Sequence, residues 1–229
     1  MLTMSILRCE TLNVSNEPID PKNPAGSYHH GDLRRALIAA ALELSAERQD
    51  WNFSLRELAR RAGVSHNAPY NHFAHKNDLM AAAATAGHAL LRGELASAVA
   101  KTQDPRSALL KMGAAYVKFG LGNAALYQLM FTAALGGPNW QPETVVAAGE
   151  GTRTILEDIF RDGAAKGLFP RNLSRRANLQ AAALCAWSAV HGLTMLAIDG
   201  LARVEHNSIE RLTDKILAMI LHGLSPQKH

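Results

Sequence analysis

Residues 53–76 read FSLRELARRAGVSHNAPYNHFAHK and contain two short helical patterns separated by a tight turn. Ser54 stands three residues before Glu57, which is the capping-box spacing that starts a helix. Gly63 ends that helix, because glycine readily adopts the positive φ that such a turn requires. The stretch therefore predicts a helix-turn-helix, and its second helix, opened by Ser65, has the form that enters a major groove by its N-terminal end.

A small hydrophobic core is expected beneath this turn. Ala59, four residues before Gly63, is small enough to let the two helices cross closely. The apolar and aromatic residues expected to fill this core are Leu55, Leu58, Val64, Tyr70 and Phe73.

Polar and basic side chains cluster around the same turn. At the start of the second helix, Asn67 can pair with adenine, His66 can bond a base edge and Ala68 can touch a thymine methyl. Hydroxyls and free backbone N–H groups at helix starts suit phosphate contacts. The full set of candidate DNA-binding residues is Ser54, Arg56, Ser65, His66, Asn67, Ala68, Tyr70, His72 and Lys76. The alternative is that His66 and Asn67 are simply solvated, and that Arg60 and Arg61 form an ordinary exposed face.

Helical periodicity extends outward from this stretch in both directions. Helices are predicted at residues 30–48, from about 75, from 105, from 124, and at 142–166, 174–198 and 207–222. With the two short helices of the turn, this makes about nine helices and no strand, an all-α chain. Asn123 is a candidate cap for the helix from 124, and residues 136–139 are expected to form a loop.

Three segments follow from this pattern. Residues 1–27 carry three prolines and no sustained periodicity, so we expect a mobile tail. Residues 28–76 form the predicted helix-turn-helix domain, and residues 77–225 a larger helical domain.

Composition narrows the function classes. The chain has 229 residues, 48% of them hydrophobic, which argues against a disordered or fibrous protein. Its net charge of +4 permits a nucleic-acid partner without demanding one. Cys9 and Cys185 form no CxxC pair, so neither a disulfide scaffold nor a structural zinc site is expected, and the reducing cytoplasm is the expected location.

Two uncharged stretches, residues 119–142 and 177–198, are long enough to span a bilayer. Glycines and a proline break the first, and polar residues interrupt the second. We therefore expect no membrane partner and interpret both stretches as helices buried in a core or a subunit interface.

Residues 63–79, GVSHNAPYNHFAHKNDL, resemble the segment GVSxxxLYxHFxxKxxL of TetR-family transcriptional regulators. In that family the segment forms the turn, the recognition helix and the start of the fourth helix, and the resemblance extends back to Gly31. One departure is Pro69, which stands where the family commonly has leucine. Another is Ala68, which stands where threonine is frequent and removes a hydroxyl that could bind phosphate.

A second resemblance lies near the C-terminus, where Trp187, His191 and Gly192 are similar to the Trp–His–Gly signature of one TetR-type ligand-binding and dimerisation domain. It implies that residues 77–225 bind an effector and that the last two helices pair with a second subunit. The candidate effector-pocket residues are Tyr116, Phe119, Tyr127, Met130, Phe131, Trp187 and His191, to which Trp140 can be added. The alternative for Trp187 and His191 is a core tryptophan over a satisfied histidine.

The resemblance implies a homodimeric, DNA-binding regulator rather than an enzyme, in which a small-molecule effector releases a repressor from a pseudo-palindromic operator. It implies no cofactor, and no metal is expected, because His72 and His75 lack companion ligands at suitable spacing. Two alternatives stay open. One is an effector-independent architectural or adaptor protein, which a void-free C-terminal domain would favour. The other is a small helical enzyme on an apolar substrate, which a clustered acid/base constellation would favour.

Overall fold

The computed structural model describes residues 30–131, 142–202 and 208–223. Within these ranges the chain is entirely helical, with eight α-helices and two short 3₁₀ helices, against the nine or so helices predicted. The predicted tail at residues 1–27 and the predicted loop at 136–139 lie outside the described residues, as does Trp140.

The first helices form a small head. Helix α1 (His30–Arg48), helix α2 (Leu55–Arg61) and the 3₁₀ helix η2 (Ala68–Asn71) pack around buried Leu37, Leu58 and Phe73. Ser54 caps α2 by accepting a hydrogen bond from the Glu57 backbone nitrogen at 3.1 Å, as predicted. Gly63 has φ +68°, which confirms the turn expected there.

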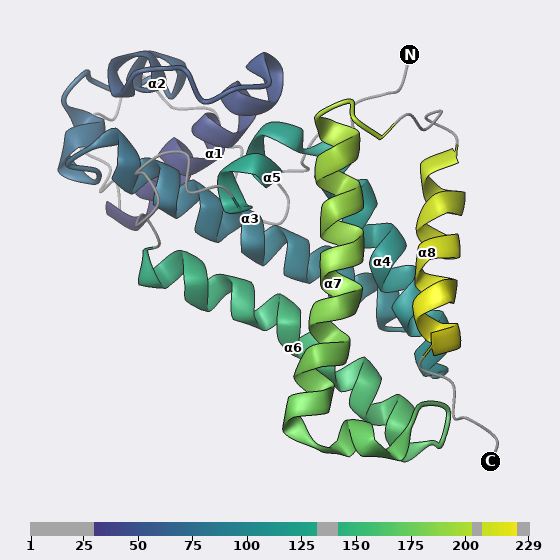
Figure 1. Cartoon of the computed structure of the whole chain (residues 1–229). Coiled ribbons are helices and arrows are strands. Elements are labelled where there is room, and N and C mark those ends of the chain that lie inside the picture. Colours follow the sequence, from purple (N-terminus) through teal and green to yellow (C-terminus); the bar gives the residue numbers. More distant parts are fainter. Residues whose placement is uncertain (1–29, 132–141, 203–207, 224–229) are drawn as a thin grey trace.

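The remaining helices form a larger body. They are α3 (Lys76–Val99), α4 (Pro105–Gly122), α5 (Ala124–Phe131), α6 (Glu143–Ala165), the 3₁₀ helix η3 (Arg171–Ser174), α7 (Arg176–Ile198) and α8 (Ile209–Gly223). Helices α7 and α8 run side by side at the edge of the body away from the head, and both pack on α4 (Figure 1). Helix α7 is also long and apolar enough to cross a membrane, a property that core helices of soluble proteins share.

Local signals set several helix boundaries in the body. Asp104 accepts from the Ser107 backbone nitrogen at 3.0 Å and caps α4, whose first residue is Pro105. The side chain of Asn123 does not cap α5 as expected. Its nitrogen instead donates to the Phe119 carbonyl at 2.9 Å, because the end of α4 leaves that carbonyl without a helical partner.

Helix α3 connects the head to the body. It begins directly after the turn, with His75 as its N-cap and the Asp78 carboxylate accepting from the His75 backbone nitrogen at 2.8 Å. From there it runs into the centre of the body, where it packs against α4, α5 and α6 (Figure 1). A second link comes from Trp51, whose indole nitrogen donates to the Ala125 carbonyl at 2.9 Å.

Candidate functional site

The turn of the head presents its polar residues to solvent. Ser65, His66 and Asn67 are all exposed, and Ala68 is partly buried. Arg56, on α2, is exposed as well, as are Ser54 and Tyr70 among the candidate phosphate-contacting residues. This exposure is the condition that a DNA-reading element must meet.

The second helix of the turn differs from the prediction. An α-helix starting at Ser65 was expected, but residues 65–67 form a turn and only residues 68–71 are helical, in the 3₁₀ form. Backbone bonds from Ala68 to Ser65 and from Tyr70 to Asn67 close i→i+3 turns. Pro69 fits this geometry, because it lies in the first turn of the 3₁₀ helix and its missing N–H group cannot form an α-helical bond to the Ser65 carbonyl, which accepts from Ala68 instead.

The two aromatic residues that follow Pro69 differ in burial. Pro69 itself is buried and Phe73 is 1% exposed, whereas Tyr70 is 47% exposed. The expectation that Tyr70 belongs to the core is therefore wrong, because the tightened segment turns its ring outward. The exposed ring keeps its hydroxyl available for a phosphate.

Several of the basic residues near the turn already have partners in the head. The Lys76 ammonium donates to the Trp51 carbonyl at 2.6 Å and lies over the Phe53 ring, and burial lowers its pKa. Arg61 pairs with Glu47 of α1, and this bond holds the pKa of that carboxyl below its usual value. Both cations therefore hold elements of the head together, and His72 is only partly exposed.

The body contains a cavity of about 680 Å³ that is bordered mainly by α3, α4, α6 and α7, with Met130 and Phe131 of α5 and Leu217 of α8 completing its lining. Its walls are mainly aliphatic and aromatic, and they include Leu91 of α3, Met112 of α4, Leu156 of α6 and Val190 of α7. A concave, mostly apolar cavity of this size with a few polar groups is typical of a small-molecule binding site.

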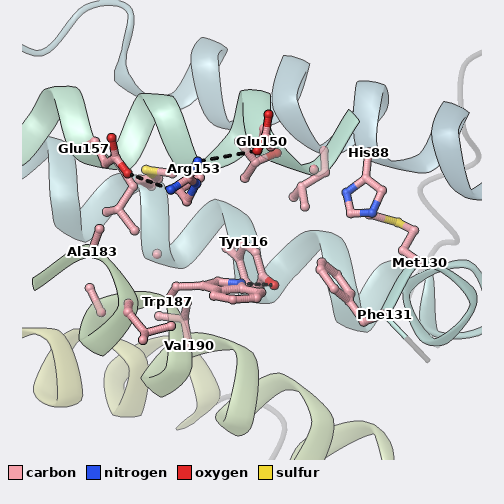
Figure 2. A pocket seen from close by; sticks show the side chains of 18 of the residues that line it. His88, Tyr116, Met130, Phe131, Glu150, Arg153, Glu157, Ala183, Trp187 and Val190 are labelled. Carbon is pink, nitrogen blue, oxygen red and sulfur yellow. Dashed lines mark hydrogen bonds and ion pairs between the residues drawn. The ribbon is translucent and has the colours of Figure 1, made fainter. Parts of the chain in front are cut away.

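Four of the seven candidate pocket residues line this cavity, namely Tyr116, Met130, Phe131 and Trp187. Figure 2 shows Trp187 and Tyr116 together on one wall, with the indole nitrogen donating to the tyrosine hydroxyl at 3.0 Å. Phe119, Tyr127 and His191 do not line it.

Tyr127 and His191 stand behind that wall and support it. The Tyr127 hydroxyl lies 2.7 Å from Nδ1 of His191 and 3.0 Å from the Tyr116 hydroxyl, which is itself 3.1 Å from the same nitrogen. Burial raises the pKa of Tyr116 to about 12 and lowers the pKa of His191, so the phenols and the imidazole are neutral. The network thereby fixes the positions of Tyr116 and, through it, Trp187.

The polar groups of the opposite wall were not predicted from the sequence. They are His88 of α3 and, on α6, Glu150, Thr152, Arg153 and Glu157. Arg153 lies between the two carboxylates (Figure 2), with Nη2 3.7 Å from Glu150 and Nη1 3.3 Å from Glu157. In the sequence these residues have the spacing of an ordinary solvated helix face, so periodicity alone does not reveal that the face borders a cavity.

Comparisons with known proteins add an independent line of evidence. A family model described as bacterial regulatory proteins, tetR family, matches residues 37–83, and one described as tetracyclin repressor-like, C-terminal domain, matches residues 109–220. Over 47 residues the chain is 49% identical to an uncharacterized HTH-type transcriptional regulator of Haemophilus influenzae. That match covers 20% of this chain and 23% of the relative, so it extends over less than a quarter of the relative's length.

Solved structures resemble nearly the whole chain. A protein of unknown function from Rhodococcus sp. RHA1 is 30% identical, with 88% of this chain and 100% of that chain covered and a TM-score of 0.72. PfmR, a TetR family transcriptional regulator from Thermus thermophilus, is 23% identical, with 84% and 100% covered and a TM-score of 0.59. At that identity the second likeness shows a shared fold.

Proposed function

The chain belongs to the TetR family of transcriptional regulators and carries its DNA-binding domain, and we propose that it is a repressor released from its operator by a small molecule. The observation that carries this proposal is the single helix α3, which follows the DNA-reading turn directly and contributes His88 and Leu91 to the cavity wall. A ligand that moves α3 also moves the reading head.

The head supplies the DNA contacts in this proposal. Asn67 and His66 read base edges from the exposed turn, Ala68 reaches a thymine methyl, and the hydroxyls of Ser54, Ser65 and Tyr70 bind phosphate. Arg56, His72 and Lys76 complete the set once DNA is bound, with Lys76 exchanging the Trp51 carbonyl for a phosphate. Phosphate contacts make the affinity fall steeply with salt.

We assign dimerisation to α7 and α8. Both helices lie at the edge of the body, and large apolar side chains remain exposed on them, with Leu196 48% and Met219 73% exposed. Pairing with a second copy would bury this surface, and it also explains the uncharged sequence of α7 without a membrane. The homodimer would act in the cytoplasm and place two heads on the two halves of a pseudo-palindromic site.

The cavity distinguishes this proposal from the alternatives. An effector-independent DNA-binding protein has no use for an apolar cavity of about 680 Å³. An enzyme needs its acid and base within reach of one substrate atom, but His88 lies near Met130 at one end of the cavity and Glu157 near Ala183 at the other (Figure 2). We therefore assign residues 77–225 to effector binding and dimerisation, and residues 28–76 to DNA binding.

The first test is selection of bound sequences from a random DNA pool. We expect a pseudo-palindromic site with half-sites about one helical turn apart. In Asn67→Ala, the preference at one position of each half-site should weaken by about 1–3 kcal/mol. Enrichment of no sequence, or of sites without symmetry, would contradict the assignment of a dimeric reader.

The second test uses the selected DNA and a library of small molecules, with fluorescence anisotropy as the measurement of DNA release. Ala183→Leu, which fills part of the cavity, should abolish release by any active compound. Ala165→Leu, on the exposed end of α6, is the matched control and should leave release unchanged. Ligands that bind the cavity without changing the DNA affinity would refute the release mechanism, because only differential affinity for two states shifts an equilibrium.

A further inference from the structure

Three buried side-chain atoms have no hydrogen-bond partner in the described part of the chain: His88 Nδ1, Thr152 Oγ1 and Glu157 Oε1. All three belong to residues that line the cavity. Buried polar atoms in folded proteins are otherwise nearly always paired. Because all three atoms border the same cavity, we infer that a bound ligand supplies their missing hydrogen-bond partners.

The His88 end of the cavity offers an acceptor. The imidazole is 4% exposed, it packs edge-on against Phe131 at 5.2 Å, and it bonds the backbone of Met130. Burial lowers its pKa, so the ring is neutral and one nitrogen donates while the other accepts. Nδ1 has no hydrogen-bond partner, so it accepts from a ligand donor when the ring proton is on Nε2.

The α6 wall of the cavity carries more carboxylates than cations. The cavity wall in the described ranges carries the carboxylates of Glu150 and Glu157 and the guanidinium of Arg153, and with His88 neutral this leaves one net negative charge. Residues 132–141 contain no Asp, Glu, Lys or Arg, so they add no charge. Arg153 is already shared by two carboxylates and is therefore poorly available to an anionic ligand.

The two ends are separated by a defined length. Gly149 of α6 packs against the His88 ring. If Gly149 were replaced by alanine, the added Cβ would lie 3.5 Å from His88 Cε1. Glu157 follows eight residues later on the same helix, which corresponds to about 12 Å along the axis. Between them run the rings of Phe131, Tyr116 and Trp187, whose faces also attract a cation.

We propose that the cavity binds an elongated, mainly apolar amine, with its protonated nitrogen at Glu157 and a second hydrogen-bond donor at His88 about 12 Å away. This inference rests on the proposed function only in treating the cavity as the effector site. The positive end donates a hydrogen bond to Glu157 Oε1, which lies 3.3 Å from Arg153 Nη1 but accepts no hydrogen bond in the described structure, and it neutralises the surplus carboxylate. An anionic ligand of the same shape would be repelled by the Glu157 carboxylate and would bind more weakly.

The charge is tested with three probes of equal chain length, namely decylamine, 1-decanol and decanoate, each kept below its micelle concentration. Their dissociation constants are measured by calorimetry on the full chain without DNA. Decylamine should bind at least about tenfold more tightly than decanoate, with 1-decanol between them, as expected of a hydrogen bond to a charged group. Glu157→Gln should bring the amine and the carboxylate within about threefold of each other. Asp158→Asn, which removes a neighbouring exposed carboxylate outside the cavity, should leave the tenfold preference intact.

The acceptor at the other end is tested with 10-amino-1-decanol, which adds a hydroxyl to the amine. It should bind about three- to tenfold more tightly than decylamine, and His88→Leu should remove this advantage while keeping the preference for amines. Equal or tighter binding of decanoate by the wild type, or no binding of any probe, overturns the proposed ligand class.

A DNA-release measurement on the same samples separates this inference from the proposed function. Release of DNA by decanoate and not by decylamine would support effector control and refute the amine. Preferential binding of decylamine with an unchanged DNA affinity would support the amine and refute the release mechanism.

Discussion

The head (α1, α2 and η2) is built from residues 30–71, whereas the cavity takes its walls from residues between His88 and Leu217. The functional groups of the head lie within one turn and its flanking helices, so a short sequence motif places them. The cavity walls meet only after α3, α4, α6 and α7 have packed together. One region is therefore a local property of the chain, and the other is a property of the tertiary fold.

The same contrast extends to energetics. The head is stabilised by a small apolar core around Leu58 and Phe73 and by ion pairs at its surface, such as Arg61 with Glu47. The body combines a larger apolar core with the buried polar network of Tyr116, Tyr127 and His191. Substitutions in the two regions should consequently differ in both the size and the kind of effect.

The largest effect is expected for Phe73→Ala. This change removes a ring that is 1% exposed and should lower the free energy of unfolding of the head by about 3–5 kcal/mol, with loss of DNA binding. Tyr70→Ala, three residues earlier and 47% exposed, should change stability by less than about 0.5 kcal/mol. Denaturation followed by circular dichroism measures both.

The Phe73→Ala protein should retain its ability to bind cavity ligands, because the cavity walls contain no residue of the head. Calorimetry with a ligand of the wild-type cavity tests this. Parallel loss of ligand binding would show that head and body fold as one unit and would remove the distinction between them.

The next effect concerns the polar network of the body. Tyr127→Phe deletes hydroxyl contacts of 2.7 Å to His191 and 3.0 Å to Tyr116 and should cost about 1–2 kcal/mol of stability. Tyr70→Phe, which removes an exposed hydroxyl from the head, is the matched control and should be close to neutral in stability. If both changes cost the same, the network does not stabilise the body.

The sequence predicted those features that depend on a single residue and the backbone next to it. Ser54 caps a helix and Gly63 takes positive φ at a helix end, because these effects depend only on the neighbouring backbone. Pro69 is also a local signal, and its effect was underestimated. Its missing N–H group is compatible with the 3₁₀ segment that stands in place of the expected α-helix, and Tyr70 in that segment is exposed.

The cavity was only partly predictable for a physical reason. Aromatic residues such as Trp187 and Phe131 indicate a helix interior, but periodicity does not separate a cavity wall from a filled core, which is why His191 was expected to line the cavity and instead supports Tyr116. Glu157 and Arg153 carry charge at ordinary surface spacing. Their position beside a cavity depends on α3 and α7, which are distant in the sequence.

A smaller effect distinguishes two glycines. Gly63→Ala forces a side chain into φ +68° and should destabilise the head by about 1–2 kcal/mol, with weaker DNA binding because the turn shifts. Gly93→Ala, in the exposed middle of α3 with open space around it, should stabilise the protein by about 0.5–1 kcal/mol. Thermal unfolding should show a lower melting temperature for Gly63→Ala and a higher one for Gly93→Ala. A higher melting temperature for both variants would mean that the turn tolerates a side chain at Gly63.

The smallest effect is expected on acidification of the body. Burial lowers the pKa of His88 in the folded chain, while the hydrogen bond to Met130 acts in the opposite direction and limits the shift. Between the folded and the unfolded pKa the unfolded chain binds more protons, so this contribution to stability is present above pH about 6.5 and is lost as the pH falls. His88→Leu should therefore lose less stability between pH 7.5 and pH 5.5 than the wild type. His222→Leu, at the exposed end of α8, should behave as the wild type does, and an equal loss in all three proteins would mean that His88 titrates as an exposed histidine does.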